Sequence, residues 1–173
     1  FSCQDVRFLL SKNVKAVIVA CNTASSNSLE YLQEKFPIPV FGTVIPGAVE
    51  AARQTKNKRV GIIATAATVR SGAYEKEIKN ADSSIEVFSK ACPLFVPLAE
   101  EGWSNDEITY LTAKKYLEPL LAEGVDTVIL GCTHYPLLKE CIQKVVGENV
   151  TLIDPAYETA VRVDDYLNRN AMT

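Results

Sequence analysis

Two cysteines occupy equivalent positions in two similar stretches of the sequence. In each stretch a short apolar run ends in a small residue, a cysteine and polar residues that open a helical pattern: KAVIVACNT (15–23) and DTVILGCTH (126–134). The repetition indicates two similar half-units, each placing a thiol, Cys21 or Cys132, at the carboxyl end of a buried strand. Open α/β sheets bind their ligands at that end of their strands.

This placement suits thiol chemistry. A cysteine at the start of a helix lies near the positive end of the helix dipole and near free backbone N–H groups, and both favour the thiolate. If the two thiols face one cleft, one thiolate can remove a proton from a carbon acid while the other thiol delivers a proton from the opposite side. The carbon centre is then inverted. Asn22, Thr23 and Thr133 follow the cysteines, and their amide and hydroxyl groups can hold a carboxylate.

The other three cysteines lack such surroundings. Cys141 falls on the apolar face of a helical pattern, Cys92 precedes Pro93, and Cys3 lies close to the first residue. Free cysteine commonly packs as a small hydrophobic residue. We therefore assign these three a structural role.

Other chemistry remains as an alternative for the two thiols. A cysteine–histidine hydrolase is the main one, because His134 lies two residues after Cys132 and can act as a base near neutral pH. That mechanism leaves Cys21 without a role. Zinc is not expected, since only Cys132 and His134 are close in sequence and structural zinc sites normally use two close-spaced pairs.

No cofactor is expected either. The sequence contains neither GxGxxG nor GxxxxGK[ST], the glycine-rich patterns that hold dinucleotides and nucleoside triphosphates. A pyridoxal enzyme needs a lysine at the mouth of its site, and no lysine follows a predicted strand end in a comparable context.

The elements that would position the thiols alternate between strands and helices. Continuous short apolar runs are typical of strands buried on both faces, and they occur at 15–20, 38–44, 59–64, 85–88, 126–130 and 150–153. Helical patterns lie between most of them, which predicts a parallel α/β architecture. Asp154 before Pro155 predicts a helix start, and Ser104 with Glu107 predicts a capping box. Pro119 is expected to kink or split the helix that follows.

Composition argues against several kinds of partner. The 18 basic and 21 acidic residues are interspersed and give a net charge of −3, so nucleic acid is not expected. No apolar run is long enough for a bilayer, no signal peptide is recognisable, and five cysteines without a CxxC pair indicate reduced thiols. We expect a cytoplasmic chain with no membrane partner. The helical pattern at residues 2–12, ahead of the first strand, suggests that the natural N-terminus lies upstream of Phe1.

The cysteine segments also carry a family resemblance. ACNTAS (20–25) and GCTHYP (131–136) resemble the two signature segments of bacterial glutamate racemases, within the aspartate/glutamate racemase superfamily; further similar segments follow the same order, ATAATVRSGAY (64–74) and CPLFVPLAEEGW (92–103). The resemblance implies a two-lobed α/β protein with its site at the lobe interface. It further implies an isomerase that interconverts L- and D-glutamate without a cofactor and supplies D-glutamate for peptidoglycan. Aspartate, another acidic amino acid, is the alternative substrate.

The resemblance assigns roles to individual residues. Cys21 would take the proton from D-glutamate and Cys132 from L-glutamate, with Glu100 and His134 assisting Cys132. The substrate would be held by Asn22, Thr23, Thr65, Thr68 and Thr133. From the residues alone, Glu100 is equally a solvated charge, and Thr65 and Thr68 equally cap a turn.

The same resemblance divides the chain into lobes. Residues 1–46 and 155–173 would form the first lobe and residues 47–154 the second. The family begins with a strand and an Asp-Ser-Gly turn, whose Asp assists the first cysteine, followed by a Pro-Tyr-Gly loop; this sequence contains neither. We therefore expect the first lobe to be incomplete and activity to depend on the missing segment. The expected partner is the small molecule glutamate, and the oligomeric state is left open, a homodimer included.

Overall fold

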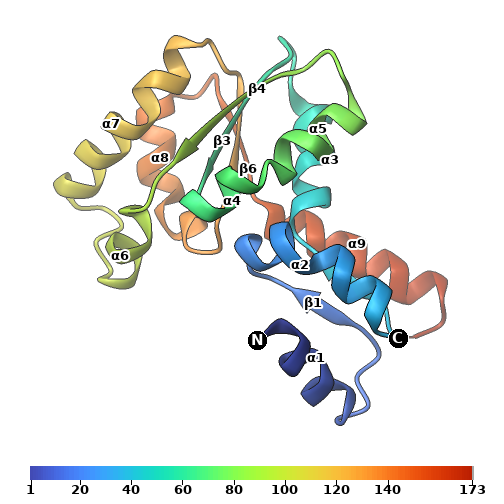
Figure 1. Ribbon diagram of the computed structural model, residues 1–173. Coiled ribbons are helices and arrows are strands. Elements are labelled where there is room, and N and C mark those ends of the chain that lie inside the picture. The colour runs from blue at the N-terminus through green and yellow to red at the C-terminus, as the bar shows by residue number, and fades with distance from the viewer. Residues whose placement is uncertain (173) are drawn as a thin grey trace.

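The computed structural model describes residues 1–172, in which parallel strands alternate with helices (Figure 1). Strands β1 (Val17–Val19) and β2 (Val40–Gly42) form a small parallel sheet. A second parallel sheet has the order β4-β3-β5-β6, formed by β3 (Arg59–Ala64), β4 (Glu86–Ala91), β5 (Thr127–Gly131) and β6 (Thr151–Ile153). Each strand overlaps an apolar run that predicted it. The predicted parallel α/β class is confirmed.

The larger sheet is covered on both faces, which explains why its central strands lack polar alternation. One face carries α6 (Phe95–Glu100), α7 (Glu107–Ala122) and α8 (Lys139–Val146), and the other carries α3 (Val44–Gln54) and α5 (Ala73–Ala81) (Figure 1). On β3, Ile63 belongs to the first of these cores and Ile62 to the second. On β5, Leu130 and Ile129 alternate in the same way. These two strands form the buried centre of the larger sheet.

The small sheet is covered by helices from both ends of the chain, α1 (Ser2–Leu10), α2 (Asn22–Lys35) and α9 (Pro155–Arg169). Val17 and Val40, one from each strand, share a core with Leu32 of α2. Tyr166 of α9 stands edge-on to Phe41 of β2, with ring centroids 5.2 Å apart. Helix α9 also packs against α3, so it contacts elements associated with both sheets.

Helices α7 and α9 each begin directly after an aspartate whose side chain caps the first turn. Asp154 accepts a hydrogen bond from a backbone N–H in the first turn of α9 at 2.9 Å, as the sequence predicted. Helix α7 begins at Glu107 with Asp106 as its cap, which accepts a backbone N–H at 2.8 Å. The predicted capping box of Ser104 and Glu107 is therefore wrong, because the carboxylate of Asp106 stands directly before the helix and takes the cap position.

Pro119 was expected to kink or split this helix, and it does not split it, because α7 continues to Ala122. Leu117 and Leu120 flank Pro119 and are buried in the same core, and their packing offsets the backbone hydrogen bond that proline cannot make. At 16 residues α7 is the longest helix among residues 1–172. Neither it nor any other helix in that range is long and apolar enough to cross a membrane.

Candidate active site

The predicted site residues gather at the carboxyl ends of the strands. Strands β3 and β5 are neighbours, and Ala64 pairs with Gly131 at their last positions. The next residues are Thr65 and Cys132, which leave the sheet side by side. From β3 the chain continues to β4 on one side, while β5 lies on the other. Such a reversal of strand order opens the crevice in which α/β sheets bind ligands.

Cys21 reaches this region from the small sheet. It is the exposed N-cap residue of α2, with an extended backbone. The hydroxyl of Thr23 lies 2.9 Å from that of Thr65 and 3.0 Å from that of Thr68, which are themselves 3.1 Å apart. Thr65 also caps the short helix α4 (Ala66–Ser71). The hydroxyl cluster therefore joins the start of α2 to the end of β3 and brings predicted residues of both sheets together.

Cys132 is connected to the two residues predicted to assist it. Nδ1 of His134 lies 3.8 Å from Sγ of Cys132, and Nε2 lies 3.1 Å from Oε1 of Glu100 at the end of α6. Each ring nitrogen thus faces one partner. A proton can pass between the thiol and the imidazole while the carboxylate orients the ring.

The two thiols differ in burial, and a charge on Cys21 affects the pKa of Cys132. Cys21 is exposed, whereas Cys132 is 8% exposed. The pKa of Cys132 is raised above its ordinary value, mainly by burial and further by a negative charge on Cys21. Hydrogen bonds from the backbone N–H of His134 and from the hydroxyl and N–H of Thr133 act in the opposite direction and lower this pKa. A charge on Cys21 shifts the pKa of Cys132, which places the two sulfur atoms near each other in the fold.

The segment after Cys132 differs from the sequence prediction. We expected an α-helix to open directly, but one 3₁₀ turn, η1 (Tyr135–Leu138), comes before α8. The buried Tyr135 anchors this turn by donating its hydroxyl to the carbonyl of Cys92 at 2.8 Å. A single short turn supplies little dipole, so a thiolate at Cys132 depends on the nearby N–H and hydroxyl groups instead.

Two buried polar residues beside the site were missed from the sequence. The hydroxyl of Tyr74 donates to Oδ1 of Asn22 at 2.5 Å, and the hydroxyl of Thr43 donates to the same oxygen at 3.1 Å. Thr43 directly follows β2, and the one polar side chain within the apolar run 38–44 was the available signal for it. Tyr74 ends one of the family-like segments, but nothing in its local pattern indicated a partner 52 residues away.

The remaining cysteines are packed into the cores. Cys92 and Cys141 are buried on the α7 and α8 side of the larger sheet, and Cys3 is partly buried against the small one. Burial raises the pKa of Cys92 to about 12 and also raises that of Cys141. Such protonated, buried thiols are unreactive. Within residues 1–172, no three His, Cys, Asp or Glu side chains gather closely enough to hold a metal ion.

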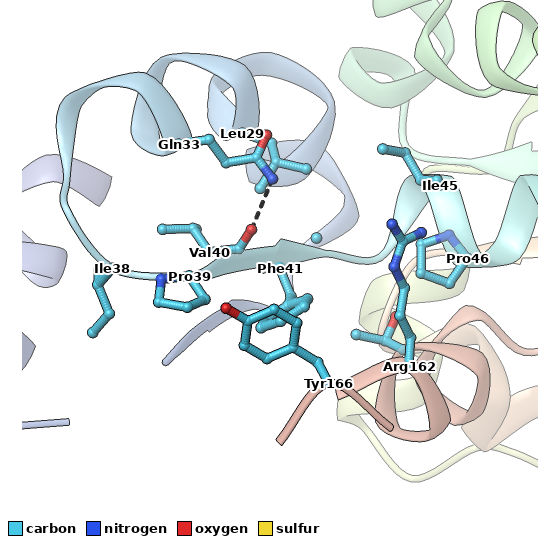
Figure 2. Close-up of a pocket in the computed structure, with 12 residues that line it drawn as sticks. Leu29, Gln33, Ile38, Pro39, Val40, Phe41, Ile45, Pro46, Arg162 and Tyr166 are labelled. Atoms are coloured by element: carbon cyan, nitrogen blue, oxygen red, sulfur yellow. Dashed lines mark hydrogen bonds between the residues drawn. The ribbon is translucent and has the colours of Figure 1, made fainter. Parts of the chain in front are cut away.

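A separate pocket opens between α2, β2 and α9, with a cavity volume of about 320 Å³ (Figure 2). Phe41, Arg162 and Tyr166 line it, and Gln33 donates to the carbonyl of Val40 at 2.8 Å in its wall. None of the predicted site residues belongs to its lining. This pocket is therefore distinct from the region of the two thiols.

The fold and the paired strand-end cysteines define a class of α/β racemases. The chain matches the Asp/Glu/Hydantoin racemase family over residues 3–163 and belongs to that family. It is 52% identical over 167 residues to the glutamate racemase of Geobacter metallireducens, an alignment that covers 96% of this chain and 62% of that protein.

Solved structures give the same assignment. The glutamate racemase isoform RacE1 of Bacillus anthracis superposes with a TM-score of 0.95 at 41% identity, covering 99% of this chain and 65% of that one. The glutamate racemase of Francisella tularensis, solved in complex with D-glutamate, gives 0.88 at 38% identity, covering 95% and 61%. This chain thus spans less than two thirds of the length of each of these relatives.

Proposed function

We propose that this chain carries the two-cysteine site of a cofactor-independent glutamate racemase, an isomerase that interconverts L- and D-glutamate. The observation that carries the proposal is the placement of Cys21 and Cys132 at strand ends where the charge of one shifts the pKa of the other. Relatives that bear the name glutamate racemase, among them one at 52% identity, support the choice of substrate.

Racemisation requires two proton transfers at one carbon. Cys21, as a thiolate, removes the α-proton of D-glutamate, so that the C–H bond breaks and an S–H bond forms. Cys132, as a thiol, then gives its proton to the opposite face of the carbanion and leaves L-glutamate. The reverse reaction begins at the Cys132 thiolate and ends at the Cys21 thiol. No electrons leave the substrate, so the reaction balances without a redox partner.

The surrounding polar residues have two roles, proton exchange with Cys132 and binding of the substrate. His134, held by Glu100, exchanges a proton with Cys132. The charged groups of glutamate are held by Asn22, Thr23, Thr65, Thr68 and Thr133. Fixed hydroxyl and amide donors are suited to the negative charge that develops as the α-proton leaves.

The proposal extends to the organisation of the protein and its place in the cell. Residues 1–46 with 155–173 form one lobe and residues 47–154 the other, with the substrate between them. The product D-glutamate serves peptidoglycan synthesis in the cytoplasm, and the protein is a candidate homodimer.

The proposal is tested with protein expressed from the complete reading frame. In D₂O, with a chelator and without pyridoxal phosphate, L-glutamate should lose its optical activity while deuterium enters at Cα, because each turnover exchanges one proton with the thiols. Circular dichroism and proton NMR follow the two events. Faster racemisation of aspartate than of glutamate would assign the other substrate, and loss of activity with the chelator would favour a metal mechanism.

A further inference from the structure

We propose that Tyr74 is a positioning residue for the two-thiol site, which fixes the amide of Asn22 and spaces the two segments that carry the cysteines. This inference rests on the proposed racemase function. It adds a residue that lies in neither cysteine motif.

Tyr74 contacts a direct neighbour of each cysteine. Its hydroxyl is hydrogen-bonded to Asn22, the residue after Cys21, at 2.5 Å. Its ring lies against Gly131, the residue before Cys132, so closely that a methyl group added at Gly131 would be 3.3 Å from Cε2. The side chain is 2% exposed. One rigid, buried ring therefore connects the start of α2 to the end of β5.

Two hydroxyl groups donate to the same oxygen of the Asn22 amide. Oδ1 accepts from both Tyr74 and Thr43, which leaves Nδ2 on the other side of the amide group. Nδ2 has no hydrogen-bond partner among residues 1–172, yet no fully buried side-chain nitrogen or oxygen in that range lacks one. Nδ2 is therefore not fully buried, although Asn22 as a whole is 4% exposed, and its two N–H groups can donate to a carboxylate of the substrate.

Tyr74 remains a donor at every pH at which the enzyme would work. Burial raises the pKa of its phenol far above the ordinary value, and negative charge on Asp154 and on Cys132 raises it further. In the structure this protonated hydroxyl donates to Oδ1, and the hydrogen bond stabilises the observed orientation of the amide. Without that donor, the Asn22 amide is held by Thr43 alone and can rotate.

The test uses Tyr74→Phe, Asn22→Ala and their double variant in protein from the complete reading frame. Tyr74→Phe keeps the ring and loses the donor, so we expect the KM for glutamate to rise about tenfold with little change in kcat. Asn22→Ala should cost at least as much. In the double variant the loss should equal that of Asn22→Ala alone, because Tyr74 acts through Asn22. Tyr157→Phe, at a 68% exposed position, is the matched control.

Two further results separate the explanations. If the wild-type protein racemises glutamate but the two losses multiply in the double variant, or Tyr74→Phe has wild-type KM, this inference is wrong and the proposed function stands. A wild-type protein that does not racemise glutamate overturns both. Thr43→Val removes the second donor to the same oxygen and should show the same non-additivity with Asn22→Ala, which keeps the test decisive if Tyr74→Phe folds poorly.

Discussion

Cys21 is exposed at the start of a 14-residue helix, whereas Cys132 is buried beside a one-turn helix and a histidine. The same residue type is thus supplied with a proton in two different ways. Cys21 is exposed, so we expect it to exchange its proton with solvent. Cys132 has little contact with solvent, and we expect it to exchange its proton through His134. Two thiols with separate proton supplies suit a reaction in which each one works in one direction.

Serine substitution separates the two directions. Cys21→Ser and Cys132→Ser should each abolish racemisation, because a hydroxyl is far too weak a base to replace a thiolate at neutral pH. An analogue with a leaving group on its β-carbon needs only the abstracting base. We expect the Cys21→Ser variant to retain elimination from the L-analogue and the Cys132→Ser variant to retain elimination from the D-analogue. Release of the 2-oxo acid product measures both reactions. If one variant eliminated neither enantiomer and the other eliminated both at nearly the wild-type rate, the site would contain a single nucleophile.

Glu100 is expected to serve only one of these half-reactions. Glu100→Gln removes the charge that orients His134, so elimination of the L-analogue by Cys132 should slow about tenfold. Elimination of the D-analogue by Cys21 should be nearly unchanged. Glu101→Gln, one residue further along, is the matched control. Equal slowing of both enantiomers would mean that Glu100 acts on the fold and not on Cys132.

Cys92 makes the stability of the fold sensitive to alkaline pH. Its thiol has a pKa of about 12 in the fold against 9.0 for an ordinary cysteine, so the folded state holds this proton more tightly than the unfolded state. The corresponding stability is fully present below about pH 9 and is lost as the pH rises toward 12, a difference on the order of 4 kcal/mol. Urea unfolding should show a shallower decline over that range for Cys92→Ala. If the free energy of unfolding of Cys92→Ala declined as steeply as that of the wild type, the loss of stability would come from the buried tyrosines instead.

At the scale of elements, the end of β5 is held between two close neighbours. A methyl group at Gly131 would lie 2.9 Å from the carbonyl oxygen of Ile63 and 3.0 Å from Cβ of Ala64, both on the adjacent strand. Gly131→Ala should therefore force β3 and β5 apart where Thr65 and Cys132 emerge.

We expect Gly131→Ala to lower the free energy of unfolding by about 1–3 kcal/mol and to reduce racemisation in the same variant. Gly61→Ala is the control inside the same sheet, since its methyl group would meet only side-chain atoms, at 3.2 to 3.5 Å. Denaturant unfolding and racemisation rates check both variants. Equal stability of the two variants would show that the strand ends can spread without cost.

Much of this arrangement could be predicted from the sequence because it is local. After their first residues, Arg59 and Asp126, the runs RVGIIA and DTVIL lie between two cores and contain only apolar residues and the buried Thr127. The pattern therefore marks the strands within one residue. Strand β4 lies at the edge with Glu86 and Lys90 in it, and its predicted end was three residues early. The cap of α7 was misplaced because Ser104 and Asp106 both suit that role, and local sequence does not rank them.

The site was predictable only as far as its motifs extend. Cys21 and Cys132 each carry their signal in the neighbouring residues, and the family resemblance supplied Thr65 and Glu100. Tyr74 carries no such signal, because its role depends on a hydrogen bond to Asn22 that exists only after the chain has folded. The roles assigned to all these residues remain predictions until the variants are measured.

At the scale of the whole molecule, polar contacts join the two sheets on the side of the thiols. They are the hydroxyl cluster around Thr23, the bond from Tyr74 to Asn22, and the ion pair of Lys76 with Glu30 at 3.0 Å. The buried apolar clusters of the two sheets are separate, and the packing of α9 against α3 is a further link between them. An assembly joined by polar groups at its site can respond to a ligand that binds those same groups.

This arrangement predicts an uneven response to glutamate in hydrogen exchange. Strands β1 and β2 have three residues each and a small core, so their amides should exchange faster than those of β3 and β5, which are buried on both faces. Glutamate should protect the start of α2 and α4, where Thr23 meets Thr65 and Thr68, and leave α7 unchanged. Peptide-resolved mass spectrometry with and without D-glutamate measures both effects.

Thr23→Val should remove the protection of α4 while the exchange of α7 stays the same, because that variant disconnects the two sheets at the hydroxyl cluster without changing the larger core. Protection that spreads evenly over β1, β3 and α7 would instead mean that glutamate stabilises the fold as a single unit, and the site would not be the joint between two separable sheets.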